Sequence, residues 1–329
     1  MIIYTLFFKT LIMSNLLLFN IFSLFLSNLM MIWFFMEISN FLFITLMMSH
    51  MKYKKMIFLY FIIQVISSSM IIFMIILNIL MNKHFYLNFM MIIPLLLKLN
   101  IPPFHLWLPL ICKSLPWKTI IILLTVQKLS PFYFISLLKM PILLLYMILI
   151  LTSLIPPYML INNTNIKMLM AYSSINHSGW MIMLINTNNT MWFKYFIFYT
   201  LIMYTFLNMI YYYKMFMNMS SIPYINLNIL PMIFMFNLAG MPPFSFFFMK
   251  WYSMFLMIYS SNLFFILILM MMSSLIMMYI YISMMIYFMF MNKFIFKFFM
   301  TSSPLTHHYN FNFFWKFLAL SMSLIILII

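Results

Sequence analysis

Four ionisable side chains lie inside long apolar runs and could carry protons through them. Glu37, in WFFMEISNFLF, is the only acidic residue of the chain. Lys98 lies in IIPLLLKLNIPPFHLW, Lys128 in LLTVQKLSPF and Lys250 in GMPPFSFFFMKW. A charge near the centre of a bilayer costs roughly 2.5–3.5 kcal/mol, so four such groups oppose insertion by roughly 10 kcal/mol. Ionisable residues that face the interior of a helix bundle usually mark ion pathways or proton relays.

Each of these residues also has a plainer interpretation. Lys250, near the end of its run, could extend its ammonium group to the membrane surface, and Glu37 could be a structural ion-pair partner only. The prolines beside the three lysines could be simple kinks. Three breaks near three lysines favour function, because a broken membrane helix needs protein or a cavity to satisfy its exposed backbone groups. We therefore predict that helical hydrogen bonding lapses near Pro102-Pro103, Pro131 and Pro242-Pro243.

Polar residues in two other runs could connect the charges. In AYSSINHSGW, the side chains of Ser173, Asn176 and His177 recur at helical spacing and form one stripe. His177 is of the residue type that titrates near neutrality when unperturbed, which suits a relay, although a hydrogen-bonded packing histidine is the alternative. Gln64 adds a polar group to the third run. These four residues are candidate relay positions.

The composition sets the class of protein. The chain has 329 residues, of which 67% are hydrophobic and 5% are charged. Soluble domains carry about a quarter charged residues, so this is an integral membrane protein. Its apolar runs have the length of membrane helices, roughly 20 residues. The net charge of +16 could suggest nucleic acid in a soluble protein. Here the lysines lie mostly in short links, and no basic run long enough to follow a phosphate backbone exists, so we expect no nucleic-acid partner.

No feature of the sequence suggests a redox cofactor or a metal in this chain. Cys112 is the single cysteine, and two glycines cannot build a GxGxxG or Walker motif. His307-His308 is a loop pair of the kind that is usually solvated. The 44 methionines fit an A/T-rich codon bias, which is typical of an organelle or an endosymbiont. The N-terminus MIIYTLFFKT lacks a presequence pattern, so we expect synthesis inside the organelle.

The apolar runs predict an all-α polytopic protein with a single transmembrane domain over residues 1–329. We place about eleven spans, of which the ninth is a discontinuous helix because it contains Gly240-Met241-Pro242-Pro243. The predicted spans are 4–26, 28–48, 57–81, 87–104, 118–138, 141–161, 167–187, 192–213, 226–258, 263–290 and 313–329.

The lysines orient these spans. When the links alternate between the two faces, eleven lysines fall on the face of the N-terminus, three fall on the other face, and three lie within the membrane. Lysine-rich links favour the cytoplasm-like side of a membrane. We therefore predict that the N-terminus and the Lys52–Lys55 link lie together on that side.

Four segments, in this order, carry a family resemblance: KLNIPPFHLWLP, TVQKLSP, MLMAYSSINHSGWM and GMPPFSFFFMKW. They resemble the proton-pumping, antiporter-like membrane subunits of respiratory complex I, and the resemblance covers nearly the whole chain. It implies an inverted-repeat bundle that lacks the family's first three helices. It also implies that Glu37, Lys98, Lys128 and Lys250 occupy the family's proton-path positions. Three departures from the family pattern are Asn100, Leu110 and Phe246.

The resemblance also implies a cellular setting. The chain is expected in the mitochondrial inner membrane, with its N-terminus on the matrix side, as a subunit of a proton-translocating NADH:ubiquinone reductase. FMN, iron–sulfur clusters and ubiquinone are expected in other subunits of that complex. The expected partners are subunits 4 and 4L, accessory subunits and lipids such as cardiolipin. The A/T bias favours an insect source. A stand-alone cation/proton antiporter and a non-pumping structural subunit remain alternatives.

The mechanism that these residues suggest is a charge relay. An opposite charge within about 4–6 Å strongly changes how tightly a group holds its proton, so we expect Glu37 and Lys98 to approach within about that range. Movement of Glu37 then changes how easily Lys98 releases a proton. Lys128 passes the charge onward, and Lys250 exchanges it with the far side. The energy must come from redox chemistry elsewhere in the complex.

Overall fold

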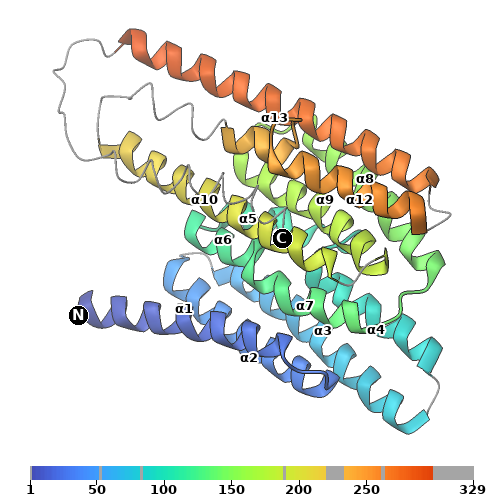
Figure 1. The fold of residues 1–329 in the computed structure, drawn as a ribbon. Helices are drawn as coiled ribbons and strands as arrows, with labels where there is room; N and C mark the ends of the chain where they lie inside the picture. Colours follow the sequence, from blue (N-terminus) through green and yellow to red (C-terminus); the bar gives the residue numbers. More distant parts are fainter. Residues whose placement is uncertain are drawn as a thin grey trace.

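The computed structural model describes residues 2–51, 54–81, 84–187, 190–219, 233–260 and 264–298, and these parts of the chain are helices joined by short links. Figure 1 shows long helices packed side by side in one bundle, with α13 along one edge. Residues 233–239 are also helical. The labelled helices are α1 (Ile2–Leu24), α2 (Leu29–His50), α3 (Lys54–Met81), α4 (His84–Leu99), α5 (Trp107–Ser114), α6 (Trp117–Leu124), α7 (Val126–Leu137), α8 (Ile142–Leu160), α9 (Ile166–Thr187), α10 (Met191–Met219), α12 (Ser245–Ser260) and α13 (Phe264–Phe298).

The prediction of an all-helical membrane protein is confirmed. Within the described residues, seven helical segments are long and apolar enough to cross a membrane, and two shorter apolar helices, Phe89–Leu99 and Ser245–Ile258, accompany them. The predicted run 167–187 corresponds to α9, and α5 is a short helix that the runs did not indicate. The predicted run 313–329 and the His307-His308 pair lie outside the described residues.

Helix α9 forms the centre of the bundle. All of its residues from 169 to 185 are buried, and it packs against α5, α7, α8, α10 and α12. A helix that is buried on every side has no lipid-facing stripe, so its serines, asparagine and histidine cannot reach water or headgroups. Their polar atoms must be satisfied by neighbouring helices, and this helix therefore brings polar groups into the core.

The start of α1 and the end of α2 lie at the same end of the bundle (Figure 1). Lys52 of the predicted link lies outside the described residues. Helices α1 and α2 pack against each other and run in opposite directions (Figure 1). His50, the last residue of α2, has Lys9 and Lys118 as electrostatic neighbours. Basic side chains from α1, α2 and α6 therefore gather on one face.

Two helices end in the same kind of turn, each followed by a Pro-Pro pair. After α4, Asn100 adopts a left-handed φ of 63°, and the N–H of Ile101 donates to the carbonyl of Leu96 at 3.0 Å. After residues 233–239, Gly240 adopts a φ of 80°, and the N–H of Met241 donates to the carbonyl of Phe236 at 3.3 Å. Both are Schellman-type helix ends.

These turns confirm the predicted interruptions at Pro102-Pro103 and Pro242-Pro243, since residues 100–106 and 240–244 are not helical. They also explain one departure from the family pattern. Asparagine is, after glycine, among the residues that tolerate the left-handed region best, so Asn100 can stand where a glycine is expected. Leu110 lies on an exposed position of α5.

The predicted interruption at Pro131 is wrong. Helix α7 is continuous from Val126 to Leu137 and includes Pro131. The interruption falls earlier, at Thr125, between α6 and α7. A proline leaves the carbonyl four residues before it without its helical partner and crowds that carbonyl. Here that carbonyl belongs to Gln127, in the first turn of α7, so the disturbance coincides with a helix end and leaves the later turns regular.

Candidate functional site

The only acidic residue of the sequence, Glu37, is partly buried and forms an ion pair with a buried lysine. Lys98 Nζ lies 2.8 Å from Glu37 Oε1, and the side chains of Lys98 and Glu37 are 3% and 15% exposed. The predicted approach of the two groups is confirmed. Asn40, one turn along α2, adds a weak amide hydrogen bond to the same carboxylate oxygen at 3.4 Å. Lys98 lies in the last turn of α4, where the negative end of the helix dipole favours a cation.

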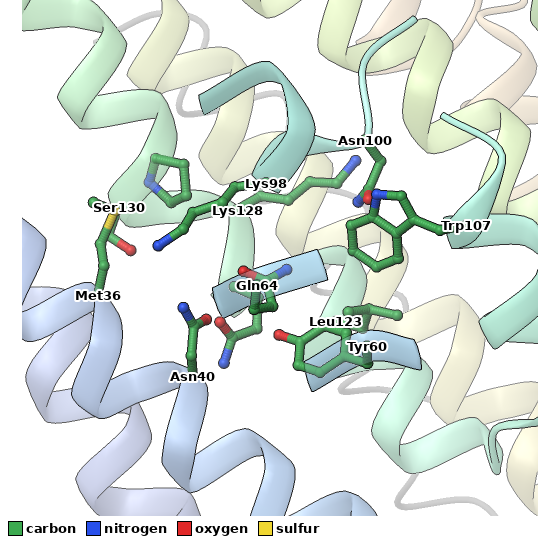
Figure 2. A pocket seen from close by; sticks show the side chains of 12 residues that line it. Met36, Asn40, Tyr60, Gln64, Lys98, Asn100, Trp107, Leu123, Lys128 and Ser130 are labelled. Atoms are coloured by element: carbon green, nitrogen blue, oxygen red, sulfur yellow. The ribbon is translucent and has the colours of Figure 1, made fainter. Parts of the chain in front are cut away.

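A small polar cavity adjoins this pair. The space open to the centre of a water molecule is about 10 Å³, which is room for about one water. Figure 2 shows Lys98 and Lys128 in the middle of the cavity wall, with Gln64 and Tyr60 of α3 on one side. The lining residues are Met36, Asn40, Tyr60, Gln64, Lys98, Asn100, Trp107, Leu123, Gln127, Lys128, Ser130 and Pro131.

Hydrogen bonds from α7 fix the walls of this cavity. The amide of Gln127 donates to the carbonyl of Ser39 on α2 at 3.2 Å. The hydroxyl of Ser130 donates to Asn20 Oδ1 on α1 at 2.9 Å. Both bonds tie α7 to the first two helices, so that Lys128, which lies between these residues on α7, is held opposite the ion pair.

Lys128 is buried and turns toward the central helix. Its Nζ donates to the hydroxyl of Ser174 at 3.3 Å and to the carbonyl of Ser174 at 3.4 Å. The hydroxyl of Ser174 in turn donates to Ala171 within α9 at 2.6 Å. The contact made by α9 is therefore with Ser174 and not with its predicted neighbour Ser173.

His177 lies one turn further along α9. Its Nδ1 is 2.8 Å from the hydroxyl of Tyr195 on α10, and its ring lies 4.8 Å from the ring of Phe246 on α12. Lys128 and Lys250 are both electrostatic neighbours of this imidazole. His177 therefore lies between the second and third lysines of the predicted relay, Lys128 and Lys250, and packs against Phe246.

Lys250 is buried and reaches back to the end of the preceding helix. Its Nζ donates to the carbonyl of Ala239 at 3.4 Å. A Cβ on Gly240 would lie only 3.0 Å from this ammonium group, so glycine leaves the space that the lysine occupies. The side chain points into the bundle, which removes the interpretation that Lys250 extends to the membrane surface. Like Lys98, it lies at the negative end of a helix.

The remaining predicted relay residues are buried in α9 but touch none of the three lysines through a hydrogen bond in the described structure. The hydroxyl of Ser173 donates to Met170 of its own helix at 3.0 Å, and Asn176 Oδ1 has no hydrogen-bond partner among the described residues. Sequence reasoning missed Ser174, Tyr195 and Gln127. The position of Gln127 beside Lys128 was an available signal. For Ser174 no signal existed, because α9 is buried on all sides.

No metal centre is evident in the part of the chain that the structure describes. No group of three or more His, Cys, Asp or Glu side chains is placed to hold a metal there. Cys112 is buried without a disulfide. The described site is built from one carboxylate, three lysines, one histidine and neutral hydrogen-bonding groups, and this set can hold and pass protons.

Comparison with known proteins identifies the family. Residues 26–277 match the family described as "NADH:quinone oxidoreductase/Mrp antiporter, TM". The chain is 35% identical over 204 residues to the NADH-ubiquinone oxidoreductase chain 2 of Anopheles gambiae, and this match covers 58% of the chain and 59% of that relative. The match therefore spans less than two thirds of that relative's length.

Two further similarities extend over more of the molecule. The NADH-ubiquinone oxidoreductase chain 2 of Rhipicephalus sanguineus is 32% identical over 274 residues, which is 79% of this chain and 83% of that relative. A chain in the structure of respiratory complex I from Thermus thermophilus with bound Aureothin has a TM-score of 0.71 at 16% identity, over 94% of this chain and 75% of that one. The chain therefore belongs to the NADH:quinone oxidoreductase/Mrp antiporter family and groups with its NADH-ubiquinone oxidoreductase chain 2 members.

Proposed function

We propose that this chain is a proton-translocating membrane subunit of respiratory complex I in the mitochondrial inner membrane. One observation carries the proposal: the single side-chain carboxylate of the sequence is partly buried and pairs with a buried lysine at 2.8 Å. An acidic side chain inside a membrane helix does not help to keep the protein soluble, so another reason is needed for the presence of Glu37. Because a buried charge is costly unless it is paired, the pair and the two further buried lysines are best explained by proton transfer.

The Glu37–Lys98 pair acts as the switch of this mechanism. While Glu37 lies against Lys98, the carboxylate favours the protonated ammonium group. When Glu37 moves away, Lys98 is left as an unpaired charge in a buried site, and release of its proton becomes easier. Redox chemistry elsewhere in the complex supplies the energy for that movement. Each charge moved against the membrane potential costs about 2.3 kcal/mol per 100 mV.

Protons continue from Lys98 to Lys128 and then to Lys250. The shared cavity between Lys98 and Lys128 supports the first step. The nearness of His177 to both Lys128 and Lys250 supports a relay through this imidazole in the second step. Gln64 in the cavity wall, and Ser173 and Asn176 on α9, are further relay positions.

The fold that accompanies this function is an inverted-repeat bundle of eleven spans, in one transmembrane domain over residues 1–329, without the family's first three helices. The turn at Asn100 and the turn at Gly240 are alike in their left-handed residue, their Schellman-type bonds and the Pro-Pro pair that follows. Two such turns about 140 residues apart support two related halves. The N-terminus and its lysines face the matrix.

The remaining parts of the enzyme lie in other chains. FMN, iron–sulfur clusters and ubiquinone belong to other subunits of the complex, and this chain takes part in NADH:ubiquinone reduction by moving protons. Its neighbours are the membrane subunits 4 and 4L, accessory subunits and lipids such as cardiolipin. The mitochondrial relatives, among them the mosquito chain, support this setting and an insect source.

Two measurements separate the proposal from its alternatives. A stand-alone antiporter purifies alone or as a small oligomer, whereas a complex I subunit purifies only within a very large assembly, so the native mass distinguishes them. Proton uptake driven by NADH in vesicles that contain the assembly distinguishes a pumping from a structural subunit. Lys128→Met lowers the ratio of protons moved to electrons transferred. Lys139→Met, at an exposed link position, is the matched control and leaves the ratio unchanged. An unchanged ratio in Lys128→Met contradicts the proposal.

A further inference from the structure

Asn237 is a buried side chain that joins the two parts of the second broken helix. It lies in the helical segment 233–239, before the turn at Gly240, and is 0% exposed. Its Oδ1 accepts the hydroxyl of Ser245 at 3.1 Å and the backbone N–H of Phe246 at 3.3 Å. Both donors lie in the first turn of α12, beyond the break. The first N–H groups of a helix have no partner within that helix, so Asn237 caps α12 from the preceding segment.

These bonds determine which way the amide of Asn237 faces. A backbone N–H can only donate, so the atom beside the N–H of Phe246 must be the side-chain oxygen. The amide nitrogen, Nδ2, is buried and has no hydrogen-bond partner among the described residues. The position of this side chain therefore serves its oxygen, which accepts two bonds.

Lys250 bridges the same break in the opposite direction. Its Nζ, which comes from α12, donates to the carbonyl of Ala239 at 3.4 Å, and Ala239 is the last helical residue before the turn. A charged donor makes a stronger hydrogen bond than a neutral one. This bridge therefore weakens whenever Lys250 releases its proton, whereas the bridge made by Asn237 joins neutral groups and keeps its strength.

The first broken helix is also bridged by a buried side chain. The indole N–H of Trp107 on α5 donates to the carbonyl of Leu97 on α4 at 3.2 Å. Leu97 is the residue before Lys98, and the bond again joins two neutral groups. Each break thus has one neutral bridge close to a lysine of the proposed relay.

We propose that Asn237 is a positioning residue for Lys250. By capping α12 from the segment 233–239, it holds the two parts of the broken helix in a fixed relation while Lys250 changes its charge. The lysine therefore stays against the carbonyl of Ala239 in both of its states. This inference rests on the proposed function, which uses Lys250 as the last lysine of the relay, and it adds the residue that holds this lysine in place.

Two variants of Asn237 and one control separate this role from a purely structural one. Asn237→Leu keeps the approximate size of the side chain and removes the acceptor oxygen. Asn237→Asp keeps an acceptor oxygen and, as a carboxylate, adds a negative charge two residues from Ala239. Asn162→Leu, the same change at an exposed position of the α8–α9 link, is the matched control. All variants are made in the assembled complex, and native mass checks the assembly.

The first measurement is the rate of NADH-driven proton pumping as a function of pH. Asn237→Leu should pump about fivefold more slowly, the effect of one lost hydrogen bond on a barrier. The alkaline limb of its profile should move to lower pH, because the ammonium group of Lys250 loses the carbonyl that favours its charged form. A cap that only stabilised α12 would leave this limb in place.

The other two variants should behave differently from Asn237→Leu. Asn237→Asp should keep most of the pumping rate, because an oxygen still caps α12. Its alkaline limb should move to higher pH, because a nearby negative charge favours the charged form of Lys250. Asn162→Leu should match the unmodified complex in rate and profile.

The second measurement combines Asn237→Leu with Lys250→Met. Residues that act as a unit have effects that do not add, so the double variant should pump at the rate of Lys250→Met alone. A further loss in the double variant, a normal rate in Asn237→Leu, or an unchanged alkaline limb in either Asn237 variant overturns the inference. If Asn237→Leu does not assemble, the alkaline limb of Asn237→Asp decides. Normal pumping in Lys250→Met is a different result, because it overturns the role of Lys250 in the proposed function itself.

Discussion

Removal of one member of the Glu37–Lys98 pair should destabilise the protein more than removal of both. At 2.8 Å and an effective dielectric constant of about 20, two unit charges attract each other by about 6 kcal/mol. Desolvation of both groups offsets most of this attraction, so the pair itself contributes little net stability. A single variant leaves the other charge buried without a partner, which costs about 3–5 kcal/mol. The combination Glu37→Gln with Lys98→Met leaves no charge behind.

The two single variants should differ in a defined order. Glu37→Gln leaves Lys98, whose side chain is 3% exposed, and Lys98→Met leaves Glu37, whose side chain is 15% exposed. The less exposed charge loses more hydration, so Glu37→Gln should cost more. Each remaining group can reduce its cost by losing its charge, Lys98 by releasing a proton and Glu37 by binding one, so both losses fall toward the lower end of the range of about 3–5 kcal/mol.

The assay is thermal inactivation of the purified complex, compared across the unmodified chain, the two single variants and the double variant. Both single variants should inactivate at lower temperature, and the double variant should recover most of the loss. Its proton pumping should not recover, because the switch is absent. If the two single effects add within about 0.5 kcal/mol, the usual limit for independent sites, the two residues do not interact and the reasoning is refuted.

Two further predictions concern glycines that the structure requires. Gly179→Ala places a Cβ 2.6 Å from Thr152 Oγ1 and 3.0 Å from Thr152 Cβ, so α8 and α9 must separate, at a cost of about 1–3 kcal/mol. The inactivation temperature of the complex should fall, and the added change Thr152→Ala should recover part of the loss. An unchanged inactivation temperature refutes this packing. Gly240→Ala strains a residue at a φ of 80° and brings a Cβ to 3.0 Å from Lys250 Nζ. The variant should lower the rate of proton pumping even where the complex assembles normally. A normal pumping rate shows that the position of Lys250 is not critical.

The membrane class and most of the spans could be predicted from the sequence. So could the position of the start of α1 at the same end of the bundle as the end of α2. The length of an apolar run and the lysines in the links beside it reflect the cost of transfer into the bilayer. That cost is a local property of each run. The central position of α9 could not be predicted in this way. Its run contains several polar residues, and only the assembled bundle determines that no side of it faces lipid.

The pairing of Glu37 with Lys98 could be predicted because the chain holds one carboxylate and because an unpaired buried charge is costly. The partner of Lys128 could not, since Ser173 and Ser174 are adjacent and the rotation of α9 decides which one faces α7. Pro131 was misleading for a related reason. The sequence shows which carbonyl loses its partner, but not that a helix begins one residue before it, at Val126.

The ratio of protons translocated to electrons transferred in a complex that contains Lys98→Met tests the central claim most directly. Lys98 is the lysine paired with Glu37, the only acid of the chain, so the proposed relay cannot begin without it. Electron transfer is measured in the same vesicles to ensure that the redox part of the complex is intact. The account predicts normal electron transfer with a lowered ratio. A normal ratio at a normal rate of electron transfer would contradict it.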